Sequence, residues 1–160
     1  MVIADRFWPR VVKGPAPEDC WIWTGAIGDD GYGRFWTRRP DGGQQVLRPQ
    51  RYAFEQITGL VLERDVMLLH WCDVPLCVHA DVDSATSHLR EGDARANMID
   101  RTQRGRYAGP TTTLTSVGTA RRERAARSRA LRAFVLECGY DAAGMRKVLA
   151  GIDEDLPTLF

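Results

Sequence analysis

With 160 residues, of which 44% are hydrophobic, the chain is long enough for one modest domain with a small core and an appendage. It holds no run of about 18 apolar residues, which excludes a transmembrane helix and leads us to expect no membrane partner. The formal net charge of +1 neither indicates nor excludes a nucleic-acid partner.

The first part of the chain predicts short antiparallel strands. Residues 1–19, with three prolines, predict an irregular lead-in. Because they also lack the basic-then-apolar order of a signal peptide, we expect a cytoplasmic protein. Aromatic and β-branched residues over 21–24 and 32–37 predict two strands, and the turn residues of 28–31 join them as a hairpin. A third short strand is expected over 45–48.

The middle of the chain predicts helix, strand, cysteine-rich loop and helix. Residues 51–57 have a helical pattern, and the apolar strand 65–70 follows, ending in His70. Beyond the loop, a helix is expected over 93–104, with Asp93 as its N-cap. The motif region is therefore expected to run from a strand through the loop into a helix.

The C-terminal part predicts a linker and two helices. Residues 107–118 resemble a linker, and helices over 119–138 and 141–150 follow it. The apolar stripe of the first helix is expected to consist of Ala126, Ala130, Ala133, Phe134 and Val135. We therefore expect one domain over 1–106 and a helical DNA-binding or dimerisation tail over 119–160.

Two cysteines in the loop after the apolar strand have the spacing of zinc ligands. Cys72 and Cys77 have four residues between them, within the range of structural zinc loops. Cytosolic cysteines stay reduced and bind metal more often than they form disulfides. A tetrahedral site needs two more ligands, and the candidates are His88 and Cys20, then His79 and Cys138. The competing interpretation is that the loop cysteines are ordinary buried thiols.

His70 and Asn97 are candidates for catalysis. His70 ends an apolar strand, and an imidazole can take a proton from water near neutral pH as a general base. Asn97 lies in the middle of a predicted helix, where asparagine is a poor helix former, and its amide oxygen suits a hard cation such as Mg²⁺. A structural histidine and an exposed asparagine are the alternatives.

Together these motifs resemble those of HNH-type nucleases of the ββα-metal superfamily, and most of all the His-Cys box homing endonucleases and their phage relatives. The resemblance covers about residues 19–106. The matching segments are Cys20-Trp21-Ile22-Trp23-Thr24-Gly25, Gly31-Tyr32-Gly33-Arg34-Phe35, His70-x-Cys72-Asp73-x-Pro75-x-Cys77, His88-Leu89, Gly92, Asn97-Met98-Ile99-Asp100 and Arg104-Gly105-Arg106. The resemblance implies an α+β fold: a zinc-stabilised ββα-metal nuclease core with N-terminal antiparallel hairpins, here followed by a C-terminal helical appendage.

The resemblance also implies roles for individual residues. His70 would be the general base that activates the attacking water, and Asn97 would ligate one catalytic Mg²⁺. The structural zinc would be held by Cys20, Cys72, Cys77 and His88. An arginine usually helps to neutralise the phosphate in this family, and Arg51 is the first choice here, with Arg34 behind it.

The chain departs from the family pattern in two places. Ten residues separate the second loop cysteine from His88, where relatives usually have four, so His79 stays open as the zinc ligand in its place. The spacing from His88 to Asn97 fits the family, so residues 79–87 are interpreted as a loop insertion. Leu69 stands where many HNH proteins carry a metal-binding Asp or His, which makes Asn97 the main expected Mg²⁺ ligand.

Arginine side chains provide the expected DNA contacts, because a planar guanidinium suits both phosphate and guanine. A GC-rich genome explains the preference for arginine over lysine equally well. The expected contacts are Arg34, Trp36, Arg38, Arg39 and Arg48 in the early strands, and Arg101, Arg104, Arg121, Arg122 and Arg124 later in the chain. A sheet in the major groove and a helix along the phosphates would provide them, and solvated surfaces are the alternative.

These patterns predict a Mg²⁺-dependent, homing-type endonuclease that acts on double-stranded DNA in the bacterial host cytoplasm, at the nucleoid. A monomer would nick one strand, and a homodimer would cut both. The alternative is a zinc-stabilised DNA-binding or packaging-associated module without cleavage activity. Residues 155–160 loosely resemble a bacterial sliding-clamp-binding peptide, for which a frayed terminus is the other interpretation.

Overall fold

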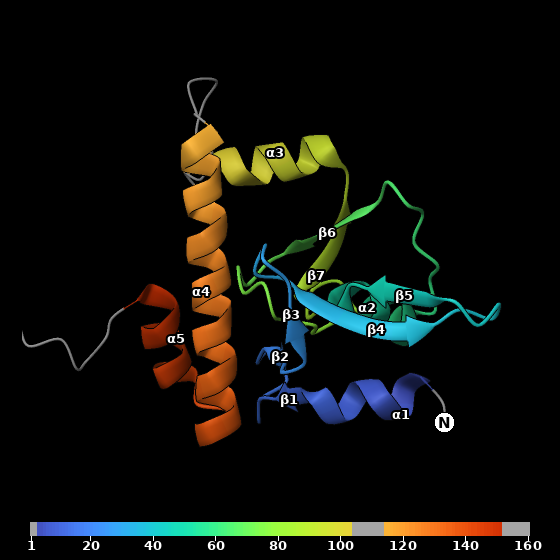
Figure 1. Ribbon diagram of the computed structural model, residues 1–160, viewed down its shortest axis with the longest axis horizontal. Helices are drawn as coiled ribbons and strands as arrows, with labels where there is room; N and C mark the ends of the chain where they lie inside the picture. Colours follow the sequence, from blue (N-terminus) through green and yellow to red (C-terminus); the bar gives the residue numbers. More distant parts are fainter. Residues whose placement is uncertain (1–2, 104–113, 152–160) are drawn as a thin grey trace, which may run out of the picture.

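Small antiparallel sheets and a helical C-terminal part make up this computed structural model, which describes residues 3–103 and 114–151 (Figure 1). The α+β class predicted from the sequence is therefore confirmed. Two sequence expectations, the phosphate-contacting Arg104 and the clamp-like peptide 155–160, lie outside the described residues.

The N-terminal segment has regular structure, so the prediction of an irregular lead-in is wrong. It contains the helix α1 (Ile3–Phe7), the short 3-10 helix η1 (Trp8–Arg10) and the strand β1 (Val11–Lys13). Phe7 anchors this segment to the core, because its ring is fully buried and stacks on Trp23 with the ring centroids 5.1 Å apart.

The strands after it exist where the sequence predicts them, but they have different partners. They are β2 (Trp21–Trp23), β3 (Ala26–Ile27), β4 (Gly33–Arg38) and β5 (Gln44–Leu47). β2 pairs antiparallel with β1, whereas β4 lies between β3 and β5 in a three-stranded sheet. The predicted hairpin between β2 and β4 is therefore wrong. Trp23 and Phe35 meet through their rings in the core, 5.6 Å apart, and not through their backbones.

A strand–loop–strand–helix unit forms the centre of the chain. It follows the helix α2 (Pro49–Thr58) and consists of β6 (Met67–His70), β7 (Leu89–Gly92) and α3 (Ala94–Gln103). β6 and β7 pair antiparallel, with His70 opposite Leu89, and α3 contacts both strands. As predicted, Asp93 caps α3, because its side chain accepts a hydrogen bond from the Ala96 amide at 2.6 Å.

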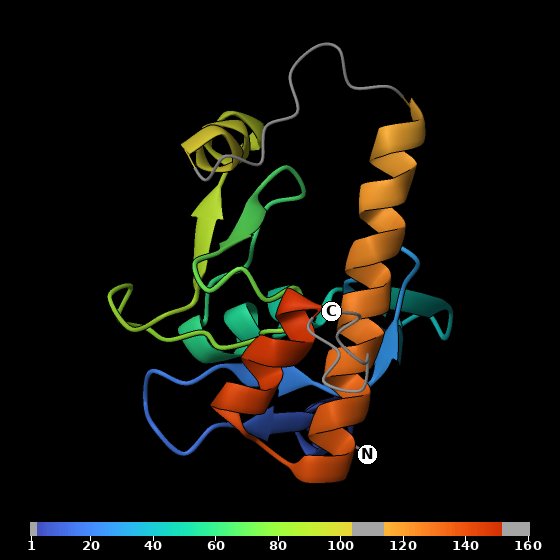
Figure 2. The same cartoon turned by 90° about the vertical axis from the view of Figure 1, so that its left-hand side faces the viewer.

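The C-terminal helices belong to the main core. α4 (Leu114–Cys138) begins inside the predicted linker, and α5 (Ala142–Ala150) packs against it (Figures 1 and 2). Leu131, Val135 and Met145 are buried in the same cluster as Phe7, Ile22 and Trp23. The described residues of the predicted tail therefore share one core with residues 3–103.

The buried face of α4 differs from the predicted stripe. Ala126, Ala130 and Ala133 are exposed, whereas Ala125, Ser128, Leu131 and Val135 are buried. Arginines border this buried face: Arg124 Nε donates to the Asp30 carbonyl at 2.8 Å, and Arg132 Nε donates to the Thr24 carbonyl at 2.7 Å. The buried face of α4 is thus shifted by about one residue from the predicted stripe, and arginine side chains bind the helix to the loops around β3.

Candidate metal centre and the histidine beside it

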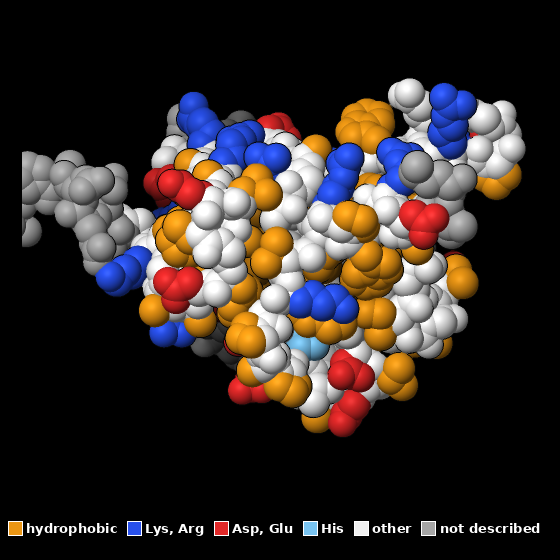
Figure 3. Space-filling model, turned by 90° about the horizontal axis from the view of Figure 1, so that it is seen from below, with side chains coloured by type: hydrophobic (Ala, Val, Ile, Leu, Met, Phe, Trp, Pro, Cys, Tyr) orange, Lys and Arg blue, Asp and Glu red, His pale blue; other side chains and the backbone are white. Residues whose placement is uncertain are grey.

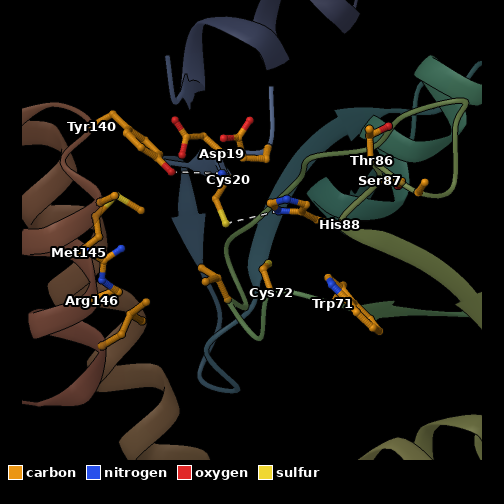
Figure 4. A pocket seen from close by; sticks show the side chains of 15 residues that line it. Asp19, Cys20, Trp71, Cys72, Thr86, Ser87, His88, Tyr140, Met145 and Arg146 are labelled. Atoms are coloured by element: carbon orange, nitrogen blue, oxygen red, sulfur yellow. Dashed lines mark hydrogen bonds between the residues drawn. The ribbon is translucent and has the colours of Figure 1, made fainter. Parts of the chain in front are cut away.

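Four side chains from separate parts of the chain meet beside the loop that joins β6 to β7. Figure 4 shows three of them, Cys20, Cys72 and His88. The four are Cys20, Cys72, Cys77 and His88, and one ligand atom from each lies within 4.8 Å of all the others. His88 Nδ1 lies 3.5 Å from the sulfur atoms of both Cys20 and Cys77. Zn–S and Zn–N bonds of about 2.3 and 2.0–2.1 Å in a tetrahedron place sulfur and nitrogen about 3.6 Å apart. The group can therefore hold a metal ion such as zinc.

Backbone pairing brings Cys20 to the loop. Ile22 and Cys77 form an isolated antiparallel bridge, so residues 76–78 run beside β2. Two bonds of 2.8 Å hold this pairing: the Trp23 amide donates to the Leu76 carbonyl, and the Val78 amide donates to the Trp21 carbonyl. This pairing holds β2 beside the cysteine loop and so brings in Cys20, the residue before β2. No second cysteine stands near Cys20 in the sequence to mark it as a ligand.

The two alternative ligands lie outside this group. His79 Nδ1 is 2.7 Å from the Asp19 carbonyl, and its ring stacks on Trp21 with the centroids 4.4 Å apart. Cys138 is exposed at the end of α4. The structure therefore assembles the ligand set built on His88, and His79 supports the site by packing beside it, with 4.4 Å between the two histidine rings.

The three thiols of the group influence each other's ionisation. Hydrogen bonds from Cys20, and then from Cys77, hold the pKa of the Cys72 thiol far below its usual range. The hydrogen bond to Cys72 raises the pKa of Cys20 to about 12, and burial is the main cause that raises the pKa of Cys77. Because a metal needs deprotonated ligands, its affinity should fall as the pH falls.

A cavity of about 510 Å³ opens beside the metal-ligand group. Cys20, Cys72 and His88 line one side of it, and Met145 and Arg146 of α5 line the opposite side together with Tyr140, which lies just before that helix (Figure 4). The Tyr140 hydroxyl accepts a hydrogen bond from the Cys20 amide at 3.2 Å. The C-terminal helices therefore cover the metal-ligand group and take part in holding one of its ligands.

His70 lies at the end of β6, next to this group in sequence but outside it. Its side chain is half-buried, and its ring centroid lies 6.1 Å from that of Tyr32. Neither ring nitrogen has a hydrogen-bond partner among the described residues. The His70 ring lies close enough to Cys72 to contribute to the lowered pKa of that thiol, after the larger effects of Cys20 and Cys77. Its geometry toward the Cys72 sulfur is not that of a hydrogen bond. A histidine with both nitrogens unengaged is available for proton transfer.

Asn97 lies in the first half of α3 and is half-buried. Its backbone amide donates to the Asp93 carbonyl at 2.9 Å, which continues the helix start set by that residue. Because α3 packs on β6 and β7, Asn97 and His70 belong to the same structural unit.

Arg51, the first choice for the phosphate contact, stabilises a loop instead. Its guanidinium donates to the carbonyls of Leu62, Glu63 and Val66, and it forms an ion pair of 3.6 Å with Glu55. Backbone carbonyls after α2 thus occupy its donors. We therefore assign Arg51 to the fold and not to the site.

Asp30 organises a group of arginines that the sequence did not reveal. Its carboxylate accepts hydrogen bonds from Arg34 at 3.0 Å and from Arg48 at 2.8 Å. Burial alone would raise the pKa of Asp30, but these bonds outweigh it and hold the pKa well below its usual range. In the sequence Asp30 stands in Gly28-Asp29-Asp30-Gly31, where it reads only as a turn residue.

The lowered pKa of Asp30 makes a pH-dependent contribution to stability. A carboxylate whose pKa is lower in the folded state stabilises the fold above its unfolded pKa of about 3.9, and this contribution is lost as the pH falls through the folded value. We expect Asp30→Asn to cost about 1–2 kcal/mol at pH 7, from two charge-assisted bonds in a partly screened site. Urea unfolding at pH 7 and at pH 3 should show the difference from wild type shrinking in acid. If the two proteins differ by the same free energy of unfolding at both pH values, this account is wrong. Any acid sensitivity of the thiols is common to both proteins and cancels in the difference.

The expected DNA contacts have different surroundings. On the outer face of β4, Trp36 is 54% exposed and Arg38 is exposed, and Arg39, which follows the strand, is exposed as well. Arg121 pairs with Asp29 at 2.7 Å, and Arg122 bonds the Gly118 carbonyl within α4. Of the remaining expected contacts, Arg101 lies in α3. On the face seen in Figure 3, basic, acidic and hydrophobic side chains are mixed, and basic ones gather along one edge of that view.

Comparison with known proteins finds one similar curated protein and no family. No protein-family model matches the chain, and no solved structure matches it. Protein 7.7 of Escherichia phage T7 is 32% identical over 91 residues, which are 57% of this chain and 61% of that protein. The chain thus spans about three fifths of the length of the curated relative it matches. None of the described helices is long and apolar enough to cross a membrane.

Proposed function

We propose that the chain is a metal-dependent DNA endonuclease of the HNH, ββα-metal type, with His70 as its general base. One observation carries the proposal: His70 ends β6 with both ring nitrogens unpaired, inside a strand–loop–strand–helix unit whose loop contributes to a Cys₃His group. Unpaired buried nitrogens are unusual in a purely structural histidine, because burial without a partner costs free energy.

Zinc held by Cys20, Cys72, Cys77 and His88 would act as a structural cross-link. The Trp71 amide donates to the His88 carbonyl at 2.8 Å, so the last β6 residues and the first β7 residues are paired right beside the ligands. A metal there would fix both strand ends, and with them the backbone of His70. Four protein ligands leave no open position on a tetrahedral zinc, which suits a structural role.

A catalytic cation such as Mg²⁺ would be held through the amide oxygen of Asn97. One protein oxygen suits this ion, because Mg²⁺ keeps several of its waters, and the half-buried Asn97 lies on the helix of the unit that contains His70. When bound, the ion would supply positive charge for the scissile phosphate.

The protein's own step is proton transfer. His70 would take a proton from a water molecule, whose oxygen then attacks the phosphorus while the bond to the leaving oxygen breaks. Neither ring nitrogen has to give up an existing hydrogen bond for this role. The similarity to a phage protein supports a phage-type enzyme, which would act in the cytoplasm of a bacterial host.

A plasmid assay tests the proposal. Supercoiled plasmid incubated with the full-length protein should become nicked or linear when Mg²⁺ is added and stay intact when Mg²⁺ is omitted. Mapped ends then separate a nicking monomer from a homodimer that cuts both strands. If the protein binds DNA but never cleaves it with any divalent cation, the endonuclease proposal fails. The zinc-stabilised binding module, which the exposed Trp36 beside Arg38 favours, then takes its place.

Arg38→Ala tests whether the outer face of β4 contacts DNA. A lost phosphate contact should weaken binding to all sequences alike and reduce the slope of log K against log salt by about 1. Fluorescence anisotropy with labelled duplex at several salt concentrations measures both effects. The matched control is Arg129→Ala, an exposed arginine on α4, which should leave the slope unchanged. An unchanged slope for Arg38→Ala would remove this face from the proposed interface.

A further inference from the structure

Unpaired nitrogen atoms gather around Tyr32. Among the described residues, Arg48 Nη1 and both ring nitrogens of His70 are buried without a hydrogen-bond partner. The guanidinium carbon of Arg48 lies 5.4 Å from the centre of the Tyr32 ring, and the His70 ring lies 6.1 Å from it. Because most buried polar groups are paired, such a concentration of unpaired nitrogens indicates a place where a ligand supplies the missing acceptors.

A second arginine reaches the same ring from α4. The guanidinium carbon of Arg124 also lies 5.4 Å from the centre of the Tyr32 ring. Arg124 Nε donates to the backbone carbonyl of Asp30, while Arg48 Nη2 donates to the Asp30 carboxylate, both at 2.8 Å. Asp30 therefore positions both guanidinium groups at the Tyr32 ring, and Nη1 of Arg48 has no hydrogen-bond partner among the described residues.

The approach of α4 to this place is close and depends on Gly31. Gly31 has φ +82°, and a Cβ atom there would lie 2.9 Å from Arg124 Cγ and 3.0 Å from the Ala125 amide nitrogen. A side chain at this position would thus strain the backbone and push α4 away. The ion pair of Arg121 with Asp29 fastens the same turn to the helix at 2.7 Å.

The charge of the cluster suits an anion. Arg34 and Arg48 both pair with the carboxylate of Asp30, and Arg124 binds the backbone carbonyl of the same residue. Three guanidinium groups around one carboxylate-bearing residue leave an excess of positive charge, and guanidinium groups bind phosphate oxygens through paired N–H donors. Tyr32 is half-buried and the Arg48 side chain is 41% exposed, so the cluster reaches the protein surface.

We propose that Arg48 and Arg124, held by Asp30 around Tyr32, bind a backbone phosphate of nucleic acid beside His70. Helix α4 then completes the active site instead of serving as a separate DNA-binding tail. The inference rests on the proposed function for its reaction, since a phosphate at this place lies next to the general base. It assigns to these two arginines the phosphate contact expected of Arg51.

Phosphate binding tests the inference without cleavage. Calorimetric titration of the full-length protein without Mg²⁺, with inorganic phosphate and with a short oligothymidylate, should show binding of both, and tighter binding of the oligonucleotide. Arg48→Ala and Arg124→Ala should each weaken oligonucleotide binding about tenfold or more, as expected for a lost charge-assisted hydrogen bond. Arg129→Ala, on the exposed side of α4, should bind like wild type. Equal affinity of Arg124→Ala and Arg129→Ala would overturn the inference, and so would binding of inorganic phosphate alone.

Arg124→Gln separates charge from fold. Its amide can still donate to the Asp30 carbonyl, so α4 should stay in place, which a thermal melt checks. It should lose phosphate affinity as Arg124→Ala does, and wild-type affinity in this variant would also overturn the inference. The plasmid assay separates the two proposals: cleavage by Arg124→Gln at the wild-type rate rejects the inference alone. If Arg124→Gln loses phosphate binding while the wild-type protein never cleaves plasmid, only the proposed function is rejected.

Discussion

Replacing His70 with alanine is expected to lower the rate of plasmid cleavage by about 10²–10⁴-fold, the usual contribution of a positioned general base. The fold should survive, because neither ring nitrogen of His70 makes a hydrogen bond to the residues that the structure describes. Initial rates with saturating Mg²⁺ measure the effect.

Two measurements make the His70→Ala result specific. Zinc content and affinity for uncleaved duplex should both match wild type, because His70 lies outside the Cys₃His group. His79→Ala provides the contrast, since His79 is 2% exposed and packs against Trp21 and His88, so it should lose stability before chemistry. Wild-type cleavage by His70→Ala would remove His70 from the mechanism.

Removing the candidate metal ligand Cys72 is expected to have the largest effect on stability. Cys72→Ser should lose stoichiometric zinc and become less stable by several kcal/mol, since coordination of a structural zinc contributes on the order of 10 kcal/mol in small domains. Metal analysis of the purified protein together with urea unfolding measures both quantities. A strong chelator added to wild type should reproduce the loss, and acidification should promote it because protons compete for the thiolates.

Cys138 provides the matched control for this experiment. It is also a cysteine, but it is exposed at the end of α4 and lies outside the ligand group. Cys138→Ser should keep one zinc per chain and change the free energy of unfolding by no more than about 0.5 kcal/mol. Stoichiometric zinc in Cys72→Ser would contradict the ligand set.

Local signals in the sequence were sufficient for the two loop cysteines and for the N-caps of α3 and α5. The spacing of Cys72 and Cys77 follows from loop geometry, and Asp93 and Asp141 cap their helices because a short acidic side chain reaches the free amides of the first turn. Cys20 and His88 also join the group as expected, although their positions depend on distant backbone pairing.

Features that depend on distant partners could not be predicted from the pattern. β2 has the composition of a hairpin strand, yet its partners are β1 and the cysteine loop, and nothing in its own residues specifies them. On α4, alanines carry little burial signal, and long arginine side chains can lie at the edge of a buried face, so the phase of the helix was off by one residue. The partners of Arg51 and Arg124 could not be predicted either. An arginine side chain is long and flexible, so the sequence does not show which backbone carbonyl its guanidinium will bind.

The order of these parts along the chain separates the metal centre from its cover. All four ligands lie between Cys20 and His88, whereas Leu131, Val135 and Met145, which close the core, come only in α4 and α5. During translation, every candidate metal ligand is therefore synthesised before the helices that cover the group. A growing chain that has reached the end of α3 holds the complete ligand set with one side of its core still open to solvent.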